Sequence, residues 1–347
     1  NLDPVEPGED PNPWTIIPLP MDDQYTLYCG DIDTDSYELN PNDPINGGSH
    51  NHKGFSVYAS DETTIWVGTA AGINKGIIDS DNCINWEHYN ALTHGFSGNW
   101  VIGFTHQEFY DFARIWAITW STGGVETNAV SYSDDGGTTW SIAAQIEELN
   151  IKVYNLFTQD DAVFASTQDG LYLTYDGEHW AKFSSIQDNN GQMILSETVY
   201  SSMVTVDETL WVGTPDGVAR SYDQGVNWDI YRFWELPDQD ITSESAFYAY
   251  PNPFYINEVN QFDGNGHVRF VFNDGNSGAD LDIFNFSMEK VIHLKDSNII
   301  QNDIYNNAGE FIWNGQNSYG YKVSNGVYFC RLTKGNNVNW TKVVVIN

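Results

Sequence analysis

Positive charge is scarce in this sequence: 14 Lys and Arg residues stand against 48 Asp and Glu, which gives a formal net charge of −34. A chain this acidic repels the phosphates of nucleic acids and the headgroups of anionic lipids, so we expect neither as a partner. No run of about 18 apolar residues occurs, so no transmembrane helix is expected. The apolar fraction of 41% is nevertheless too high for a disordered acidic protein, and 347 residues suffice for a substantial core.

Cysteine is scarce as well, with only Cys29, Cys83 and Cys330. Three cysteines are too few for a disulfide framework and too scattered for a zinc site. Cys29 and Cys83 can pair, but the sequence leaves this open. Cys330 follows the apolar pattern Val327-Tyr328-Phe329, so we expect it to be a buried thiol.

A repeat of nearly 50 residues organises the middle of the chain. A strand phrase of the type Ile-Trp-Val-Gly-Thr recurs with its aromatic residue at positions 66, 116, 164 and 211, in steps of 50, 48 and 47 residues. Each phrase is followed by a polar turn that ends in Trp. In the segments that Gly, Asn and Asp separate, apolar and polar residues alternate with period two. This alternation favours strands over a helical solenoid. We therefore expect one four-stranded sheet per repeat.

The polar turns share the pattern Ser-x-Asp-x-Gly-x-x-Trp. A hydroxyl and a carboxylate can bind the amides of a tight hairpin, Gly can take a positive φ, and Trp can fold back over the apolar base. Two copies are complete, one is a residue shorter and one is degraded. The expected structural residues are Ser133, Asp135, Gly137 and Trp140; Ser221, Asp223, Gly225 and Trp228; Asp176 and Trp180; and Asp81 and Trp86.

This pattern resembles the Asp-box (BNR) repeat of sialidase-like β-propellers, over roughly residues 50–236. The resemblance implies an all-β fold with a propeller at residues 14–238, after a Pro-rich and acidic linker at residues 1–13. Four clear blades are few for ring closure. Either a fifth, irregular blade occupies residues 14–50, which we favour, or the chain begins partway through a larger propeller.

Residues 239–347 have a different pattern, with short strands separated by Gly, Asn and Asp, which predicts a small β-sandwich. The strings Gly309–Gly315 and Gly320–Phe329, together with the opening Tyr250-Pro251-Asn252-Pro253-Phe254, resemble Ig-like domains of the flagellar hook-cap type and C-terminal sorting domains of type IX secretion. This resemblance implies export and surface attachment. The family's Asp-x-x-Gly turn is replaced here by Asn285-Phe286-Ser287-Met288, so that turn must be built differently. A plain Ig-like spacer is the alternative.

Ligands of such propellers approach the face opposite the Asp-box hairpins, where the joins between blades meet. His50 and His52 can share a metal if they lie on a strand, although no third ligand is identified and solvated histidines are the favoured interpretation. Trp100 begins an inner strand and is the best aromatic candidate. The candidate ligand-binding residues on this face are His50, His52, His94, Trp100, Glu147, Glu148 and Asp188.

Asp31, Asp33 and Asp35 are spaced as in some calcium loops, but Ser36 and Asn42 replace the Gly and Glu of a helix-loop-helix site, so only an irregular calcium site is expected. A sialidase would need three arginines for the substrate carboxylate. The propeller region offers only Arg114, Arg220 and Arg232, none at the start of an inner strand.

The sequence therefore predicts a secreted or outer-surface bacterial protein with no catalytic residues. Its expected role is to bind a glycan or a surface protein, or to assemble with copies of itself. The alternative is a polysaccharide-active glycoside hydrolase that uses carboxylates of the channel face. No cofactor is expected other than calcium.

Overall fold

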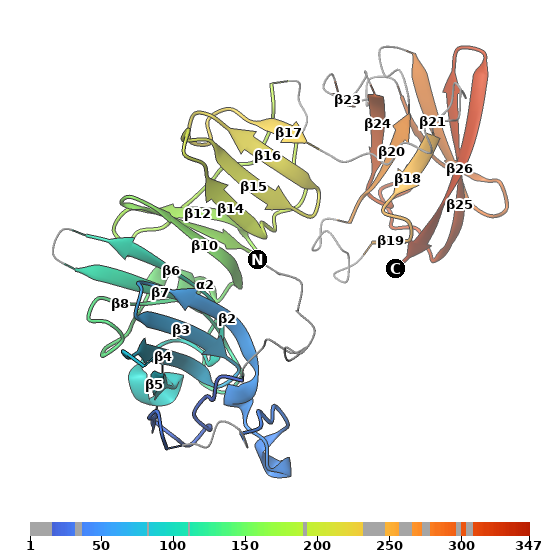
Figure 1. The fold of residues 1–347 in the computed structure, drawn as a ribbon. Helices are drawn as coiled ribbons and strands as arrows, with labels where there is room; N and C mark the ends of the chain where they lie inside the picture. Colours follow the sequence, from blue (N-terminus) through green and yellow to red (C-terminus); the bar gives the residue numbers. More distant parts are fainter. Residues whose placement is uncertain are drawn as a thin grey trace, which may run out of the picture. The chain divides into compact units, whose positions relative to one another are not determined.

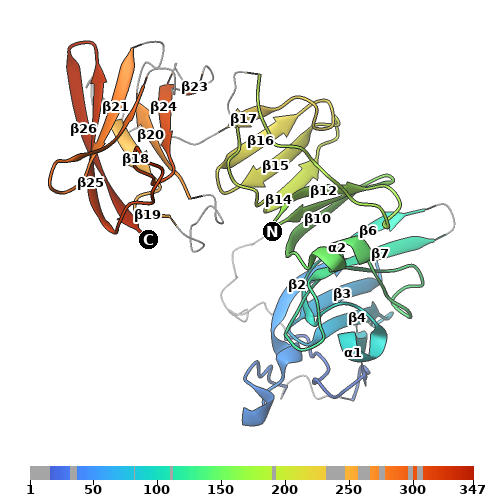
Figure 2. The same cartoon turned by 180° about the vertical axis from the view of Figure 1, so that it is seen from behind.

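The computed structural model describes residues 16–31, 37–81, 83–109, 112–189, 193–231, 247–256, 266–272, 278–295, 300–302 and 308–347. The described chain is nearly all β, as the sequence predicts, and its strands form four- and five-stranded sheets (Figures 1 and 2). The chain divides into two compact units. One comprises Asn1–Ala162 and Tyr175–His179, and the other comprises Val163–Thr174 and Trp180–Asn347. Among the described residues, no helix is long and apolar enough to cross a membrane.

Four sheets follow the four sequence repeats. The first has the order β1-β5-β4-β3-β2, with β1 (Thr26–Leu27), β2 (Gly54–Ala59), β3 (Thr64–Thr69), β4 (Gly72–Ile78) and β5 (Ile84–Tyr89). The second has the order β6-β7-β8-β9, with β6 (Trp100–Glu108), β7 (Ala113–Trp120), β8 (Ala129–Ser133) and β9 (Ser141–Ile142). The third has the order β10-β11-β12-β13, with β10 (Val153–Gln159), β11 (Ala162–Thr167), β12 (Gly170–Thr174) and β13 (Ala181–Lys182). The fourth has the order β14-β15-β16-β17, with β14 (Ser201–Val204), β15 (Leu210–Thr214), β16 (Gly217–Ser221) and β17 (Asp229–Tyr231).

In three of the four sheets, the Thr that ends the repeated strand phrase closes the next hairpin. Its hydroxyl donates to the carbonyl oxygen of a Gly three residues later, and the two residues face each other across the antiparallel pair. The O···O distances are 3.2 Å for Thr69 and Gly72, 2.8 Å for Thr167 and Gly170, and 2.8 Å for Thr214 and Gly217. The recurring Thr-x-x-Gly spacing is thus explained by a side-chain clamp on a tight turn.

The Ser-x-Asp-x-Gly-x-x-Trp turns are held by their own side chains. The Ser133 hydroxyl donates to Asp135 Oδ1 (2.8 Å) and accepts from the Gly137 amide (2.8 Å), while Asp135 Oδ1 accepts from the Thr139 amide (2.8 Å). In the fourth sheet the Gly225 amide donates to the Ser221 hydroxyl and the Asn227 amide to Asp223 Oδ1, both at 2.8 Å. In the shorter turn, Asp176 Oδ1 accepts two amides instead, those of Glu178 and His179.

The tryptophans that end these turns are all buried. Trp86, Trp140, Trp180 and Trp228 are between 3% and 8% exposed. The Trp140 indole donates to the Gly137 carbonyl and packs edge-on against Trp66 of β3 and against Phe96. Gly137 itself, at φ +95°, lies so close to Trp66 that a Cβ would meet the indole at 2.8 Å. The turn of the second sheet therefore packs directly on the repeated tryptophan of the first.

The degraded first turn differs from the sequence prediction. The carboxylate that accepts the turn amides belongs to Asp79, whose Oδ1 binds the amides of Asp81 (2.9 Å) and Cys83 (3.0 Å). Asp81 is exposed and itself provides a donor. Cys83 forms a disulfide with Cys29, which ties this turn to the N-terminal segment.

The described part of residues 16–53 does not form a separate sheet of the kind expected for a fifth blade. It contains β1, which joins the edge of the first sheet, and two 3₁₀ turns, η1 (Pro44–Asn46) and η2 (His50–His52). Leu19 and Leu27 from this segment pack with Trp86 against Ile65 and Val67 of β3. The segment thus covers the face of the first sheet that points away from the second.

The C-terminal part has two sheets around one core, in agreement with the expected sandwich architecture. One sheet has the order β18-β20-β24-β23, with β18 (Phe247–Tyr250), β20 (Val268–Phe272), β23 (Ile300–Asn302) and β24 (Ala308–Trp313). The other has the order β19-β26-β25-β21-β22, with β19 (Phe254–Tyr255), β21 (Ala279–Phe284), β22 (Lys290–Leu294), β25 (Gly326–Lys334) and β26 (Asn337–Ile346). Phe270, Phe311 and Trp313 meet Ile283 and Cys330 in this core.

The turn between β21 and β22 is built without glycine. Met288 takes a left-handed conformation at φ +62°, and the Asn285 side chain accepts a hydrogen bond from the Glu289 amide (2.9 Å). The Asn285 side chain thus stabilises a turn in which Met288 takes a left-handed conformation that methionine rarely adopts.

We expect the stability given by the Asp223 turn to depend on pH. Hydrogen bonds from the Asn227 amide and side chain, and from the Ser221 hydroxyl, lower the pKa of Asp223 to about 2. Because the folded-state pKa is lower than the unfolded one, the ionised carboxylate stabilises the fold above about pH 4, and this contribution is lost as the pH falls towards 2. Asp223→Asn should lower the urea midpoint at pH 7, with a difference from wild type that shrinks steadily below pH 4.

The matched control is Asp161→Asn, an exposed carboxylate outside the Ser-x-Asp turns. It should leave the urea midpoint unchanged over the same pH range. Equal pH profiles for Asp223→Asn and wild type would contradict this role of the turn.

Candidate functional site

His52 is used to hold the N-terminal segment. It is 8% exposed, its Nδ1 accepts from the Asn40 amide (3.0 Å), and its Nε2 lies 2.9 Å from the Tyr37 hydroxyl and 3.3 Å from the Leu19 carbonyl. His50 precedes it in a 3₁₀ turn, where residues two apart point in different directions. The strand geometry that a shared metal would require is therefore absent, and no group of three potential metal ligands occurs among the described residues.

Beside these histidines lies a buried polar cluster that the sequence analysis did not identify. Asp22 accepts from the Ser49 hydroxyl (2.8 Å), the Asn51 amide (2.7 Å) and the His50 amide (3.1 Å). Burial opposes the ionised form, but these donors outweigh it and lower the pKa of Asp22. Asn51 in turn pairs its side-chain amide with that of Asn74 in β4, with both N···O distances at 2.8 Å. The cluster fastens the segment to the first sheet.

His94 and Trp100 flank the join before the second sheet. His94 ends the short helix α1 (Ala91–His94), where its Nδ1 accepts from the Asn90 amide (3.1 Å) and its ring lies edge-on to Tyr89. Trp100, at the start of β6, is 43% exposed and touches Phe55 edge-on. Of the two, only Trp100 presents a large part of its ring to a ligand.

The candidate carboxylates do not form an acid–base pair. Glu147 and Glu148 are neighbours on the helix α2 (Ala144–Leu149), so their side chains diverge by about 100°. Glu147 accepts a hydrogen bond from the Thr127 hydroxyl (3.0 Å), and Glu148 is exposed. Asp188 belongs to the other compact unit, where it forms an isolated bridge with Trp228. Of the proposed calcium ligands, Asp31 is exposed, while Asp33 and Asp35 lie outside the described residues.

A cleft of about 210 Å³ opens between the first two sheets, beside Gly136 of the Ser-x-Asp-x-Gly-x-x-Trp turn. In its wall His106 Nε2 lies 2.9 Å from Glu108, and His106 Nδ1 lies 2.5 Å from the Tyr58 hydroxyl. Burial raises the pKa of Tyr58, so its phenol stays protonated and is a poor nucleophile. Arg114, also in the wall, binds Asp134 through two nitrogens and stacks on Tyr132 at 4.2 Å.

The second unit has a groove of about 260 Å³ beside the join before β14, the region where the sequence predicts a ligand face. Its wall is largely apolar, and Lys182 at its rim is neutralised by Asp169 (2.8 Å). Asp188 does not line this groove. The lining includes Leu171, Phe183, Ile186, Ile194, Leu195 and Val199.

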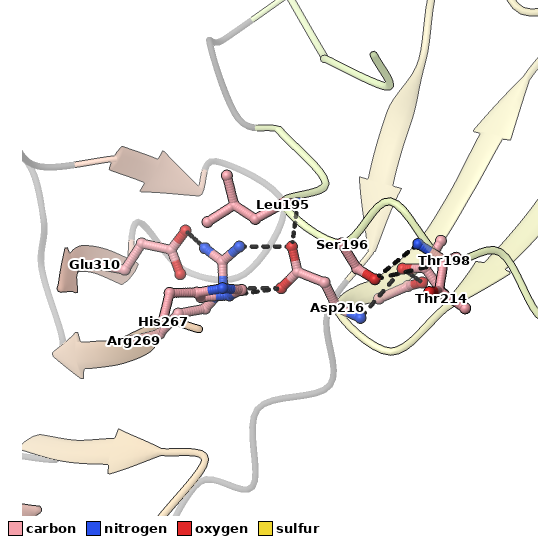
Figure 3. Close-up of polar contacts among 9 residues, drawn as sticks. Leu195, Ser196, Thr198, Thr214, Asp216, His267, Arg269 and Glu310 are labelled. Carbon is pink, nitrogen blue, oxygen red and sulfur yellow. Dashed lines mark hydrogen bonds and ion pairs between the residues drawn. The ribbon is translucent and has the colours of Figure 1, made fainter. Parts of the chain in front are cut away.

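A buried polar assembly joins the turn between β15 and β16 to strands β20 and β24 (Figure 3). Arg269 of β20 is fully buried; its Nε and Nη2 donate to the two Asp216 carboxylate oxygens (2.9 and 2.7 Å), and its Nη1 donates to Glu310 of β24 (2.6 Å). Asp216 lies in the turn between β15 and β16, and the Leu195 amide also donates to it (2.8 Å). Burial lowers the pKa of Arg269, but the two carboxylates outweigh burial and raise it, so the guanidinium stays charged.

Sequence reasoning missed this ion-pair triad, although one signal was present. Arg269 interrupts the apolar run Val268-Arg269-Phe270-Val271-Phe272, in which every residue is buried. A charged residue in such a run must find a partner because an unpaired buried charge is very costly. The run does not indicate which carboxylates pair with it, since Asp216 is 53 residues away.

No family model and no curated protein matches the chain. Similar solved structures include PorZ, an essential surface component of the type IX secretion system of Porphyromonas gingivalis (TM-score 0.38, 12% identity, 85% of this chain and 45% of that chain). They also include an ancestral GH74 enzyme (TM-score 0.38, 13%, 84% and 31%) and virginiamycin B lyase from Staphylococcus aureus (TM-score 0.38, 10%, 91% and 87%). The chain spans less than half the length of the first two. These scores are too low to transfer an activity.

Removing Arg269 should destabilise the protein strongly. Arg269→Met leaves two buried carboxylates without their cation, and losses of about 3–5 kcal/mol are typical when one partner of a buried pair is removed. Urea unfolding of the full chain measures this. The matched control is Arg220→Met, because the Arg220–Asp229 pair (2.7 Å) is partly exposed and should contribute about 1 kcal/mol or less. Equal losses of unfolding free energy in Arg269→Met and Arg220→Met would contradict a larger contribution from the buried triad.

Proposed function

We propose that the protein is an exported, non-catalytic β-propeller protein of the Asp-box type that binds or assembles at the outer surface of a bacterium. Its C-terminal sandwich is proposed to be an Ig-like secretion and attachment domain. The proposed ligand is a glycan, a surface protein or another copy of the chain.

Export is supported by the Cys29–Cys83 disulfide, because structural disulfides form and persist in oxidising compartments outside the cytosol. The bond closes a loop across a sequence separation of 54 residues and fixes the N-terminal segment on the first sheet. A formal charge of −34 keeps an extracellular chain soluble.

The observation that carries the proposal is the buried ion pair between Arg269 and Asp216. A secretion or attachment domain on a flexible tether needs no buried charge pair with the rest of the chain. Here the guanidinium is 0% exposed and all three of its nitrogens are bonded to carboxylates. The pair links strand β20 of the sandwich to the turn between β15 and β16, which supports a role in displaying a binding platform.

A non-catalytic role is supported by what the candidate catalytic groups do. His52 and Glu147 are hydrogen-bonded within the fold, and Arg114 and Arg220 are paired with aspartates. The Asp-box carboxylates bind the amides of their own turns. These groups therefore contribute to stability, and we expect no turnover from them.

The enzyme alternative is tested by measuring the reducing ends released from a panel of neutral and acidic polysaccharides. The purified full chain should release none above a buffer control. Turnover that is lost in Glu147→Gln or Glu148→Gln, with the urea midpoint unchanged, would establish the glycoside hydrolase and overturn the non-catalytic proposal.

Export is tested by expressing the full chain, with a suitable leader, in a bacterium that has type IX secretion. We expect the full chain on the cell surface or in the medium, and a chain that ends at residue 238 to remain in the cell. Full-length Arg269→Met is the control for misfolding, because it retains the sorting strings but loses the ion pair. Surface localisation of the truncated chain would contradict the proposed role of residues 239–347.

A further inference from the structure

The outer face of the β19-β26-β25-β21-β22 sheet has a composition unlike the rest of the chain. Three of the 14 Lys and Arg residues, Lys290, Arg331 and Lys342, lie on it, although the chain as a whole is strongly acidic. On β25, Tyr328, Cys330 and Leu332 point into the core. Because side chains alternate along a strand, Phe329 and Arg331 point outwards. The same alternation brings Trp340 and Lys342 of β26 to the outer face.

The strand register places these side chains in two rows across the sheet. One row is Lys342, Phe329, Phe284 and Lys290, and the next is Trp340, Arg331, Asp282 and His293. Each row has an aromatic group and at least one cation. We call these eight residues the basic sheet face. Its outermost lysines are three strand spacings apart, roughly 14 Å.

A single carboxylate orders the cations of this face. Asp282 receives Lys290 Nζ (2.8 Å) and His293 Nδ1 (3.0 Å) on one oxygen and Arg331 Nη2 (2.6 Å) on the other. Burial favours the neutral acid, but these donors outweigh burial and lower the pKa of Asp282. One negative charge therefore holds two permanent cations and a histidine, and Lys342 adds a third permanent cation beside them. The eight residues together carry three permanent positive charges and one negative charge, while Asp280, two residues before Asp282 on β21, adds a second negative charge on the same side of the sheet.

The aromatic side chains form a platform between the cations. Trp340 is 48% exposed and lies against Phe284 at 5.8 Å between ring centroids, and Arg331 stacks on both rings. Phe286, from the turn beside the face, packs on Phe329 and is itself 77% exposed. Trp340 and Phe286 thus give this face exposed aromatic surface beside its cations, a combination that is typical of binding sites.

We propose that the basic sheet face binds an acidic polysaccharide whose sugar rings carry carboxylates. Charge complementarity supports this occupant, because the fork of a guanidinium and flanking ammonium groups suit carboxylates. The exposed indole offers a flat apolar surface to the C–H face of a sugar ring. DNA carries about one charge per 1.7 Å, so the acidic remainder of the chain repels it far more strongly than a polymer with one charge per sugar. The inference rests on the proposed surface-binding function and names its ligand.

The test is affinity electrophoresis of the purified full chain in gels that contain polygalacturonate or, as the neutral comparison, dextran. Wild type should be retarded by polygalacturonate alone, and less so as salt is raised. Trp340→Ala should weaken the affinity about tenfold or more. The double variant Lys290→Gln/Lys342→Gln should weaken it similarly and also flatten its salt dependence.

Two controls lie in the same domain outside the face. Tyr319→Ala removes an aromatic residue that is 84% exposed, and Lys322→Gln removes one exposed positive charge. Both should bind as wild type does. Urea midpoints within error of wild type exclude misfolding of the test variants.

Three outcomes would overturn the inference. They are no retardation of wild type at low salt, equal retardation of all variants, and sedimentation showing self-association that Trp340→Ala abolishes, which would assign the face to a second copy of the chain. The measurement uses purified protein and is independent of export and of hydrolysis. Its failure would therefore leave the proposed function standing with another ligand.

Discussion

A sheet that is apolar on both faces must be covered on both, and this constraint shapes the first compact unit. In β3, Trp66 points to one side, and Ile65 and Val67 to the other. The second sheet covers Trp66 through Phe96, Val101 and Trp140. No preceding sheet covers the opposite side among the described residues. Residues 16–53 do so instead, held there by the disulfide and by the buried polar cluster around Asp22 and Asn51. The N-terminal segment thus replaces a sheet.

The same constraint explains why the Ser-x-Asp-x-Gly-x-x-Trp turn recurs. In two repeats its glycine lies against the strand tryptophan of the preceding repeat: a Cβ on Gly137 would meet Trp66 at 2.8 Å, and one on Gly177 would meet Trp116 at 2.9 Å. Gly225 of the fourth sheet lies against Phe183 instead. The positive φ of each glycine allows the tight turn, and its missing side chain allows the close approach. At these two places, the polar turn of one repeat therefore contacts the strand tryptophan of the repeat before it.

How much could be predicted follows from the range of the interactions involved. The sheets and turns were predictable because each depends on residues within one repeat, such as Asp135 with Thr139. The irregular blade was predicted wrongly for the described part of residues 16–53, because its packing depends on pairs such as Asn51 with Asn74 that leave no periodic pattern. The sequence did not show that Asp79, and not Asp81, binds the amides of the degraded turn, because this turn contains several aspartates. The Arg269–Asp216 pair joins residues 53 apart, and only the isolated charge in an apolar strand hinted at it.

Two arginines of the C-terminal sandwich show how burial decides what a cation can do. Arg269 is fully buried and bonded to carboxylates through all three nitrogens, so its charge is balanced within the protein. It links strand β20 to the turn that contains Asp216. Arg331 gives one nitrogen to Asp282, and its side chain is 36% exposed beside Trp340. Its field extends into solvent, where a ligand can meet it. In a chain with so few cations, buried arginine holds the fold together, while half-exposed arginine on a sheet face offers the acidic protein a place to bind another anion.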